Sequence, residues 1–418
     1  MEKYYLCIDL KSFYASVESV ERGMDPFNTN LVVADSSRGK GAICLAITPA
    51  LKAMGIPNRC RLFQIPDDVE YITAKPRMKL YMEYSANIYS VYLKYISKDD
   101  IHVYSIDECF FDITSYLELY GKTPKELAQM IIDAVYKETG ICATAGIGTN
   151  MFLAKVALDV TAKHASDHIG YLDKEEFERT LWHHRPITDI WNFGKGIEKR
   201  LQKYGVYTLY DIAHFDEKIL YKEFGVNAEF IIDHAKGIEP CTIADIKNFK
   251  SKTNSISNSQ ILFDDYDYDN ALLAMREMVD LIVLELVEKN MVTDNISLTI
   301  GYSKEVRKST GGIVKIGEYT DSRKKLLEYF TDYFKKTTDK KYPIRKITIG
   351  LNHLIHQDFM SFDLFTDFSE TEKERKRQRA IIDIRNKFGK NAVLSGMNLY
   401  EKSTTKKRNK LIGGHNGE

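Results

Sequence analysis

The chain has 418 residues, with 59 Lys and Arg against 59 Asp and Glu, 44% hydrophobic residues and six cysteines. This length exceeds what a single core supports, so several domains are expected, and the composition excludes disordered and fibrous proteins. The most apolar window, residues 271–292, carries six charged residues at helical spacing, which excludes a membrane span. The start of the chain lacks the pattern of a signal peptide, and the cysteines are scattered without zinc-site spacing. We therefore expect a protein of the reducing cytoplasm, with no membrane partner.

The zero net charge hides an uneven distribution. Residues 370–418 carry 13 Lys and Arg against six Asp and Glu, a net charge of +7, so the rest of the chain sums to −7. A basic end on an acidic body is typical of a polyanion-binding arm, but also of a solvated terminus. The charge pattern alone leaves both readings open.

The first third of the sequence predicts an α/β layer. Three short apolar and β-branched runs, residues 4–10, 109–114 and 141–147, have the length of buried strands. Between the last two, Thr123 and Glu126 form a capping box with Pro124 at the first helical position, and the helix should end at Gly140. Strands that alternate with helices favour a sheet covered by helices.

Later segments predict further domains. Residues 30–68 form a Gly- and Pro-containing insert, and residues 173–237 read as short helices joined by glycine turns. The polar stretch 238–259, with Lys247, Lys250 and Lys252, is interpreted as a tether with DNA-facing charge. From residue 255 to 351 the order β-α-β-β-α-β indicates a separate small domain of the split βαβ type.

Three carboxylates lie in segments that otherwise read as core strands. Asp9 falls within the first strand, and Asp107 and Glu108 come together at the start of the second. A buried carboxylate must be protonated, paired or metal-bound, because burying an isolated charge costs several kcal/mol. These acids could also sit at strand ends in solvent, or pair with Lys11 or Arg22. Converging at one sheet edge, they would suit a two-metal phosphoryl-transfer site.

Four motifs carry a resemblance to a known family. Residues 9–18, 104–112, 146–157 and 382–390 resemble the motifs of the Y-family translesion DNA polymerases, in the bacterial UmuC-type (ImpB/MucB/SamB) subgroup. The resemblance implies an α+β multidomain fold shaped as a right hand, with a palm, small fingers, a helical thumb containing a helix-hairpin-helix, and a split βαβ little finger. The expected boundaries are palm 1–30 and 69–170, fingers 31–68, thumb 171–237, linker 238–254, little finger 255–356 and a C-terminal tail 357–418.

The resemblance also implies roles at the active site. Asp9, Asp107 and Glu108, with the backbone carbonyl of Leu10, match the ligands of two Mg²⁺ ions. Tyr14 matches the steric gate that excludes a ribose 2′-hydroxyl, beside Phe13 as a further nucleotide contact; the alternative for Tyr14 is a core aromatic.

Two lysines match contacts to the nucleotide triphosphate. Lys163 matches the family's triphosphate lysine, with one extra residue before it after Asp159, and Lys155 is the fallback. Lys52 is a further phosphate contact in the fingers. The tyrosine usual in the fingers is absent, and Thr48 or Pro49 stands in its place.

Other residues are expected to contact DNA or a partner. Gly41 and Ala42 match the small residues that line the replicating base pair, and Gly194, Lys195 and Gly196 read as a phosphate-binding hairpin or a plain helix-joining turn. Lys250 and Lys252 are expected at DNA. The segment 361–365 resembles a sliding-clamp peptide through Phe362, Leu364 and Phe365, which could instead pack on the little finger.

The sequence thus predicts an error-prone DNA-directed DNA polymerase for lesion bypass, with primer-template DNA, a dNTP, two Mg²⁺ ions and a sliding clamp as partners. A catalytically idle DNA-binding accessory protein with the same fold is the main alternative, and a two-metal nuclease or cyclase is another. The requirement for a recombinase filament or accessory subunits stays open at this level.

Overall fold

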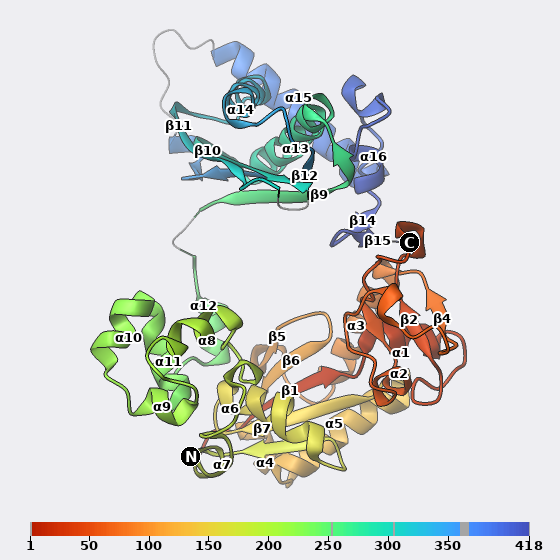
Figure 1. The fold of residues 1–418 in the computed structure, drawn as a ribbon, viewed down its shortest axis with the longest axis vertical. Coiled ribbons are helices and arrows are strands. Elements are labelled where there is room, and N and C mark those ends of the chain that lie inside the picture. Colours follow the sequence, from red (N-terminus) through yellow and green to blue (C-terminus); the bar gives the residue numbers. More distant parts are fainter. Residues whose placement is uncertain (1, 252–253, 304–305, 360–367, 418) are drawn as a thin grey trace. The chain divides into compact units, whose positions relative to one another are not determined.

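The computed structural model describes residues 2–251, 254–303, 306–359 and 368–417. The chain forms two compact units (Figure 1). The first comprises Met1–Phe249 together with His415–Glu418, and the second comprises Lys250–Gly414. Among the described residues, no helix combines the length and apolar character needed to cross a bilayer.

A five-stranded sheet forms the centre of the first unit, in the order β5-β6-β1-β7-β8. Strand β1 pairs antiparallel with both β6 and β7, while β7 and β8 run parallel. All three strands predicted in this region are confirmed, with ends shifted by one or two residues. The strands are β1 (Tyr5–Leu10), β5 (Ile101–Val103), β6 (Glu108–Asp112), β7 (Ala143–Gly148) and β8 (Ile169–Leu172).

Helices cover this sheet and share its core. The predicted capping box begins α5: the Glu126 N–H donates to Thr123 Oγ1 (3.3 Å), the Thr123 N–H donates to Glu126 Oε2 (2.8 Å), and the helix ends at Gly140 with φ 70°. The helices are α1 (Phe13–Val20), α3 (Met78–Tyr92), α4 (Thr114–Tyr120), α5 (Pro124–Thr139) and α6 (Met151–Val156).

The insert after α1 is a small sheet with its own core. Its strands are β2 (Leu31–Val33), β3 (Ala46–Ile47) and β4 (Ile72–Ala74) in the order β3-β2-β4, joined by α2 (Pro49–Ala53). Buried side chains that include Cys44, Ile47 and Cys60 form the core.

Short helices joined by turns make up residues 174–235, as predicted. Gly205 (φ 74°) and Gly225 (φ 60°) take left-handed backbone conformations, which glycine adopts without steric strain. The helices are α7 (Lys174–Leu181), α8 (Lys195–Gln202), α9 (Leu209–Ala213), α10 (Glu217–Phe224) and α11 (Ala228–Ala235).

Part of the predicted linker 238–254 is helical and packed instead of extended. Helix α12 (Ile243–Asn248) begins at a Thr242 and Asp245 capping box, and Ile243 is 2% exposed against Tyr5 and Cys7. Lys247 donates to the Lys98 carbonyl instead of facing outward from a tether. The packing of α12 therefore keeps this segment in the first unit, whose boundary falls at Phe249.

The second unit contains the predicted β-α-β-β-α-β order. Its sheet order is β11-β10-β12-β9, and α13 and α14 cover one face (Figure 1). The elements are β9 (Ile256–Tyr266), α13 (Tyr268–Glu288), β10 (Met291–Tyr302), β11 (Thr310–Thr320), α14 (Arg323–Thr337), β12 (Ile344–Asn352) and β13 (Ile355–His356).

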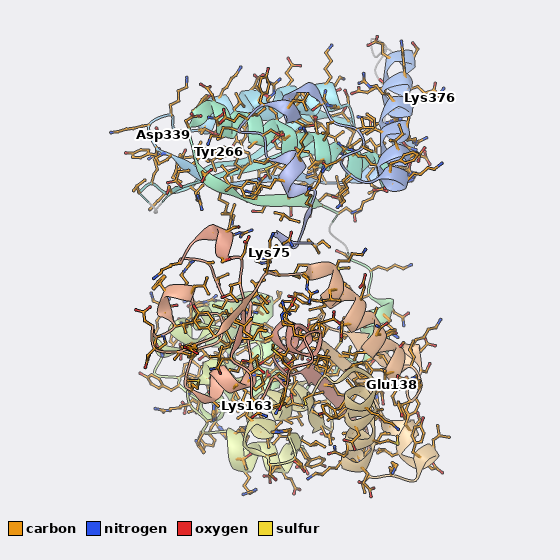
Figure 2. All side chains as sticks on the ribbon, turned by 90° about the vertical axis from the view of Figure 1, so that its right-hand side faces the viewer. Lys75, Glu138, Lys163, Tyr266, Asp339 and Lys376 are labelled. Carbon is orange, nitrogen blue, oxygen red and sulfur yellow. The ribbon has the colours of Figure 1, made fainter. Side chains whose placement is uncertain are left out.

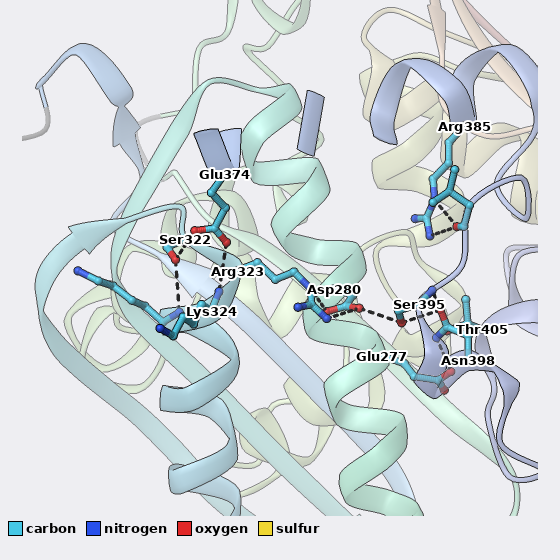
Figure 3. Close-up of polar contacts among 12 residues, drawn as sticks. Glu277, Asp280, Ser322, Arg323, Lys324, Glu374, Arg385, Ser395, Asn398 and Thr405 are labelled. Atoms are coloured by element: carbon cyan, nitrogen blue, oxygen red, sulfur yellow. Dashed lines mark hydrogen bonds and ion pairs between the residues drawn. The ribbon is translucent and has the colours of Figure 1, made fainter. Parts of the chain in front are cut away.

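Most of the described residues in the predicted C-terminal tail 357–418 pack on the second unit. The buried Glu277 of α13 accepts hydrogen bonds from Asn398 Nδ2 (2.8 Å) and the Thr404 N–H (2.7 Å), and Arg375 pairs with Asp321 (2.5 Å); Figure 3 shows part of this network. The elements are α15 (Phe368–Phe388), α16 (Thr405–Arg408), β14 (Leu411–Ile412) and, in the first unit, β15 (His415–Asn416).

Candidate active site

The three predicted carboxylates come together where β1 and β6 pair. Asp9 on β1 stands directly opposite Glu108 on β6, and directly opposite residues of an antiparallel pair project from the same face. Asp107 immediately precedes β6, and its carbonyl accepts from the Leu10 N–H (3.0 Å). Ser105 Oγ donates to Asp107 Oδ1 (2.6 Å). Strand register therefore converts two motifs about 100 residues apart into one acidic cluster.

Burial disfavours the ionised forms of the carboxylates in this cluster. It raises the pKa of the Asp9 carboxyl to about 7, and the negative charges of Asp107 and Glu108 act in the same direction. Burial also raises the pKa of Glu108, although Lys155 opposes that shift. A bound cation would relieve both effects, because it favours the ionised form of each carboxylate.

The donor set suits a hard divalent cation. Asp9, Asp107, Glu108 and the Leu10 carbonyl are all oxygen ligands, which Mg²⁺ prefers. As placed, no three His, Cys, Asp or Glu side chains within the described ranges are close enough together to enclose an ion. The chemistry of the donors and the raised pKa of Asp9 nevertheless fit such an ion.

Lys155 is the nearest cation to Glu108. Its Nζ lies 2.9 Å from Glu108 Oε1 and 3.0 Å from Asp159 Oδ1, and the residue is 7% exposed. Cys7 Sγ also donates to Glu108 Oε1 (3.1 Å). Lys155 is therefore buried between two acids and presents little surface to a triphosphate, so the fallback assignment gains no support from this geometry. The i,i+4 spacing of Lys155 and Asp159 was the signal in the sequence that could have identified the ion pair between these two residues.

The helix that carries Lys155 lies directly on the sheet. A Cβ on Gly146 would come within 2.1 Å of the Ala154 carbonyl oxygen, and one on Gly170 within 2.3 Å of the Ala157 carbonyl oxygen. After α6 the chain forms a π-helical turn, Ala157–Thr161. A π turn accommodates one more residue than an α turn, and the extra residue expected after Asp159 falls at its C-terminal end.

Lys163 follows this turn and is exposed (Figure 2). Burial lowers the pKa of Lys52 in α2, attraction by Asp9 opposes that shift, and repulsion by Lys163 adds to it. Lys52 therefore lies close enough to Asp9 of the acidic cluster, and to Lys163, for its charge to interact with both. Lys52 and Lys163 are the two lysines predicted to contact the triphosphate.

Tyr14 lies beside the same cluster. It is half-buried, and burial raises the pKa of its hydroxyl, with Asp107 adding to the effect and Arg59 opposing it. Its ring stacks on Tyr81, with centroids 4.5 Å apart and planes 17° apart. Phe13 is 3% exposed within the core of the sheet, so it presents little surface to a nucleotide.

The small residues of the insert leave open space. A Cβ built on Gly41 would meet nothing within 4 Å, while Ala42 is buried. Thr48 is also buried, and its hydroxyl accepts from the Leu31 N–H (3.1 Å). Thr48 therefore supports the insert's sheet, and Pro49 is the first residue of α2.

The predicted hairpin residues lie at the start of α8. Gly194 is the N-cap, and Gly194, Lys195 and Gly196 are all exposed. Lys250 is exposed at the start of the second unit. Four predicted residues lie outside the described part of the chain: Lys252, Phe362, Leu364 and Phe365.

The sequence reasoning missed a polar sheet face in the second unit. Ser259, Thr348 and Thr299 stand opposite one another on β9, β12 and β10, and Ser259 Oγ lies 2.8 Å from Thr348 Oγ1. Leu298 and Ile349, one residue along, point into the helix-covered core. The alternation of hydroxyl and aliphatic residues along β10 and β12 was the available signal.

The second unit as a whole is basic. It carries 30 Lys and Arg against 23 Asp and Glu, a net charge of +7.

Comparisons with known proteins agree with this geometry. Residues 8–159 match the model of the impB/mucB/samB family, and residues 253–364 match that of its C-terminal domain. The chain is 31% identical over 424 residues to the UvrX protein of Bacillus subtilis (strain 168), whose name refers to UV-damage repair, covering 99% of this chain and 97% of that protein. It is 28% identical over 428 residues to DNA polymerase IV 2 of the same organism, covering 99% of each.

A similar fold occurs among solved structures. A Y-family DNA polymerase chimera matches with a TM-score of 0.64 and 20% identity, covering 84% of this chain and 99% of that one. This likeness confirms the α+β, multidomain fold class that the sequence predicts.

Proposed function

The chain belongs to the impB/mucB/samB family, and from this membership we propose that it is a Y-family DNA-directed DNA polymerase that extends primers past damaged template bases. The observation that carries the proposal is the pairing of Asp9 with Glu108 beside Asp107 at one end of the central sheet. The names of DNA polymerase IV relatives that align over nearly the whole chain support the same reaction.

The domains follow from this proposal. We assign the sheet of β5-β6-β1-β7-β8 to the palm, the helices α7 to α11 to the thumb, and the split βαβ unit to the little finger. The insert is assigned to the fingers, and because β4 pairs with β2 we extend them from the expected 31–68 to Ala74. The assignment puts the acidic cluster in the palm and Lys52 in the fingers.

Each group at the site has a task in nucleotidyl transfer. Asp9, Asp107, Glu108 and the Leu10 carbonyl would hold two Mg²⁺ ions, which supply Lewis-acid stabilisation of the attacking and leaving oxygens. Lys52 and Lys163 offset charge on the triphosphate. Tyr14 packs where a ribose 2′-hydroxyl would project, so that deoxynucleotides are selected. Lys155 holds one oxygen of Glu108 and leaves the other available to a ligand.

DNA binding is supported by the second unit. The row of Ser259, Thr348 and Thr299, of which Ser259 and Thr299 are exposed, lacks bulky side chains and can approach a sugar-phosphate backbone closely. The net charge of +7 on this unit favours a polyanion without sequence preference. Tolerance of a damaged base is supported by the open space at Gly41. A sliding clamp at residues 361–365 remains part of the proposal from the sequence.

Primer extension on undamaged and abasic templates, with Mg²⁺ or with EDTA, tests the proposal. We expect extension on both templates that EDTA abolishes. Binding of primer-template without extension would favour the idle accessory protein, and primer shortening would indicate a nuclease.

A further inference from the structure

A buried polar network lies directly behind the ring of Tyr14. Its centre is Glu18 on α1, which is 0% exposed. Glu18 Oε1 accepts from the Tyr81 hydroxyl (2.7 Å) and from Arg77 Nε (3.0 Å), and Oε2 accepts from Arg77 Nη2 (2.7 Å) and from Arg22. Burial alone would raise the pKa of the Glu18 carboxyl, but these hydrogen bonds hold it below its usual value. The carboxylate is therefore ionised and fully engaged.

Tyr81 connects this network to the predicted gate. Tyr14 and Glu18 are four residues apart on α1, so they lie on the same face of the helix one turn apart. Tyr81, which is 0% exposed on α3, contacts both: its ring stacks on Tyr14, and its hydroxyl bonds to Glu18. The two contacts together fix the position of the Tyr81 ring along α1.

We propose that Tyr81, held in place by Glu18 and Arg77, is a positioning residue that sets the sugar selectivity of the site through Tyr14. The inference rests on the proposed function, in which the Tyr14 ring excludes a 2′-hydroxyl. Exclusion of one hydroxyl requires a ring that cannot retreat, because van der Waals repulsion falls steeply over about 1 Å. Tyr14 is only half-buried, and Tyr81 is the stacked ring that would block its retreat toward α3.

The matched control is a second tyrosine on the same helices. Tyr84 on α3 donates to Glu21 Oε1 (2.7 Å), just beyond the end of α1, and its ring also packs against the palm core. Tyr84→Leu therefore removes a similar link between α3 and α1 without removing the ring stacked on Tyr14. Tyr81→Phe keeps the stacked ring and loses only the hydrogen bond to Glu18.

Single-nucleotide incorporation with a dNTP and with the matching rNTP measures the selectivity, as the ratio of the two kcat/KM values, with melting temperature and circular dichroism recorded for each variant. We expect Tyr81→Leu to raise rNTP incorporation by about tenfold or more and to change dNTP incorporation by less than about threefold. Tyr81→Phe, which frees the stacked ring from Glu18, should lose part of the discrimination, and Tyr84→Leu should retain all of it.

The Tyr14→Ala variant separates failure of this inference from failure of the proposed gate. If Tyr14→Ala leaves the ratio unchanged, the gate itself is wrong. If Tyr14→Ala changes the ratio but a folded Tyr81→Leu does not, Tyr81 is merely structural and the inference is overturned.

The double variant Tyr14→Ala/Tyr81→Leu tests the route of action. Its ratio should equal that of Tyr14→Ala alone, because Tyr81 acts through the missing ring. Additive effects would contradict action through Tyr14. If Tyr81→Leu fails to fold, Glu18→Gln replaces it, since the amide removes the charge that binds Arg77 and weakens the acceptor of Tyr81. An unchanged ratio in a folded Glu18→Gln variant would then overturn the inference.

Discussion

Replacement of Asp9 by Asn should stabilise the protein in metal-free buffer while removing activity. The raised pKa of Asp9 means that its ionised form is disfavoured in the folded state. The shift of the Asp9 pKa from 3.8 to about 7 corresponds to a free energy of about 4 kcal/mol, at about 1.4 kcal/mol per pKa unit. This is the free energy by which ionised Asp9 destabilises the folded state. Since the buried amide of Asn also requires hydrogen bonds, we expect about 2 to 4 kcal/mol of added stability at pH 8.

The sign of the pH dependence follows from the same shift. Below pH 3.8 the Asp9 carboxyl is protonated in both the folded and the unfolded state, so it does not lower the free energy of unfolding. Between pH 3.8 and about 7 the unfolded chain releases this proton first, so the stability of the wild-type protein falls as pH rises, and above about pH 7 the loss is complete. The Asn variant lacks this contribution, so its advantage should grow between pH 4 and about 7.

Urea unfolding in EDTA at pH 5 and pH 8 measures the effect. Asp133→Asn is the control, because Asp133 is exposed on α5, and its replacement should change stability by less than about 0.5 kcal/mol. Added Mg²⁺ should stabilise the wild-type protein and leave Asp9→Asn nearly unaffected. A variant that is less stable than the wild type at pH 8 in EDTA would refute the reasoning that burial and neighbouring acids strain Asp9.

Three further predictions concern the charged groups and the clamp. Lys155→Met should destabilise the protein by about 3 to 5 kcal/mol in urea unfolding, because Glu108 loses its buried partner. The control Lys94→Met breaks an exposed pair with Glu138 and should lower the stability by only about 0 to 1 kcal/mol. Equal effects of the two substitutions would contradict the role of Lys155. Lys163→Ala should raise KM for dNTPs about tenfold in steady-state incorporation, through lost attraction to the triphosphate, and an unchanged KM would assign Lys163 to the solvated surface. Leu364→Ala/Phe365→Ala should abolish stimulation by a sliding clamp in a processivity assay and leave unassisted extension unchanged; loss of unassisted extension would make the segment structural.

Local signals in the sequence predicted several of the helices and strands correctly. The α5 capping box and the glycine turns between the helices of residues 174–235 depend on only a few neighbouring residues, so they can be recognised without knowing the fold. The acidic cluster was also predictable, because charged residues inside apolar strands require a cation or a partner.

Long-range packing could not be predicted in the same way. Helix α12 has only six residues, and the burial of Ile243 against Tyr5 depends on contacts more than 200 residues apart. The C-terminal residues around Asn398 bind to Glu277, 121 residues away, and neither sequence-based interpretation of the tail, a polyanion-binding arm or a solvated terminus, included this contact. The same limit hid the pairing of Lys155 with Glu108.

Rapid-quench incorporation of a single dNTP by Asp107→Ala tests the central claim most directly, with DNA affinity and melting temperature measured on the same preparation. If the carboxylates at the β1 and β6 pair hold the metal ions for nucleotidyl transfer, the incorporation rate should fall by about a thousandfold or more while DNA affinity and folding stay unchanged. A folded Asp107→Ala protein that keeps about a tenth of the wild-type rate, a loss of only about 1.4 kcal/mol in transition-state stabilisation, would contradict the account.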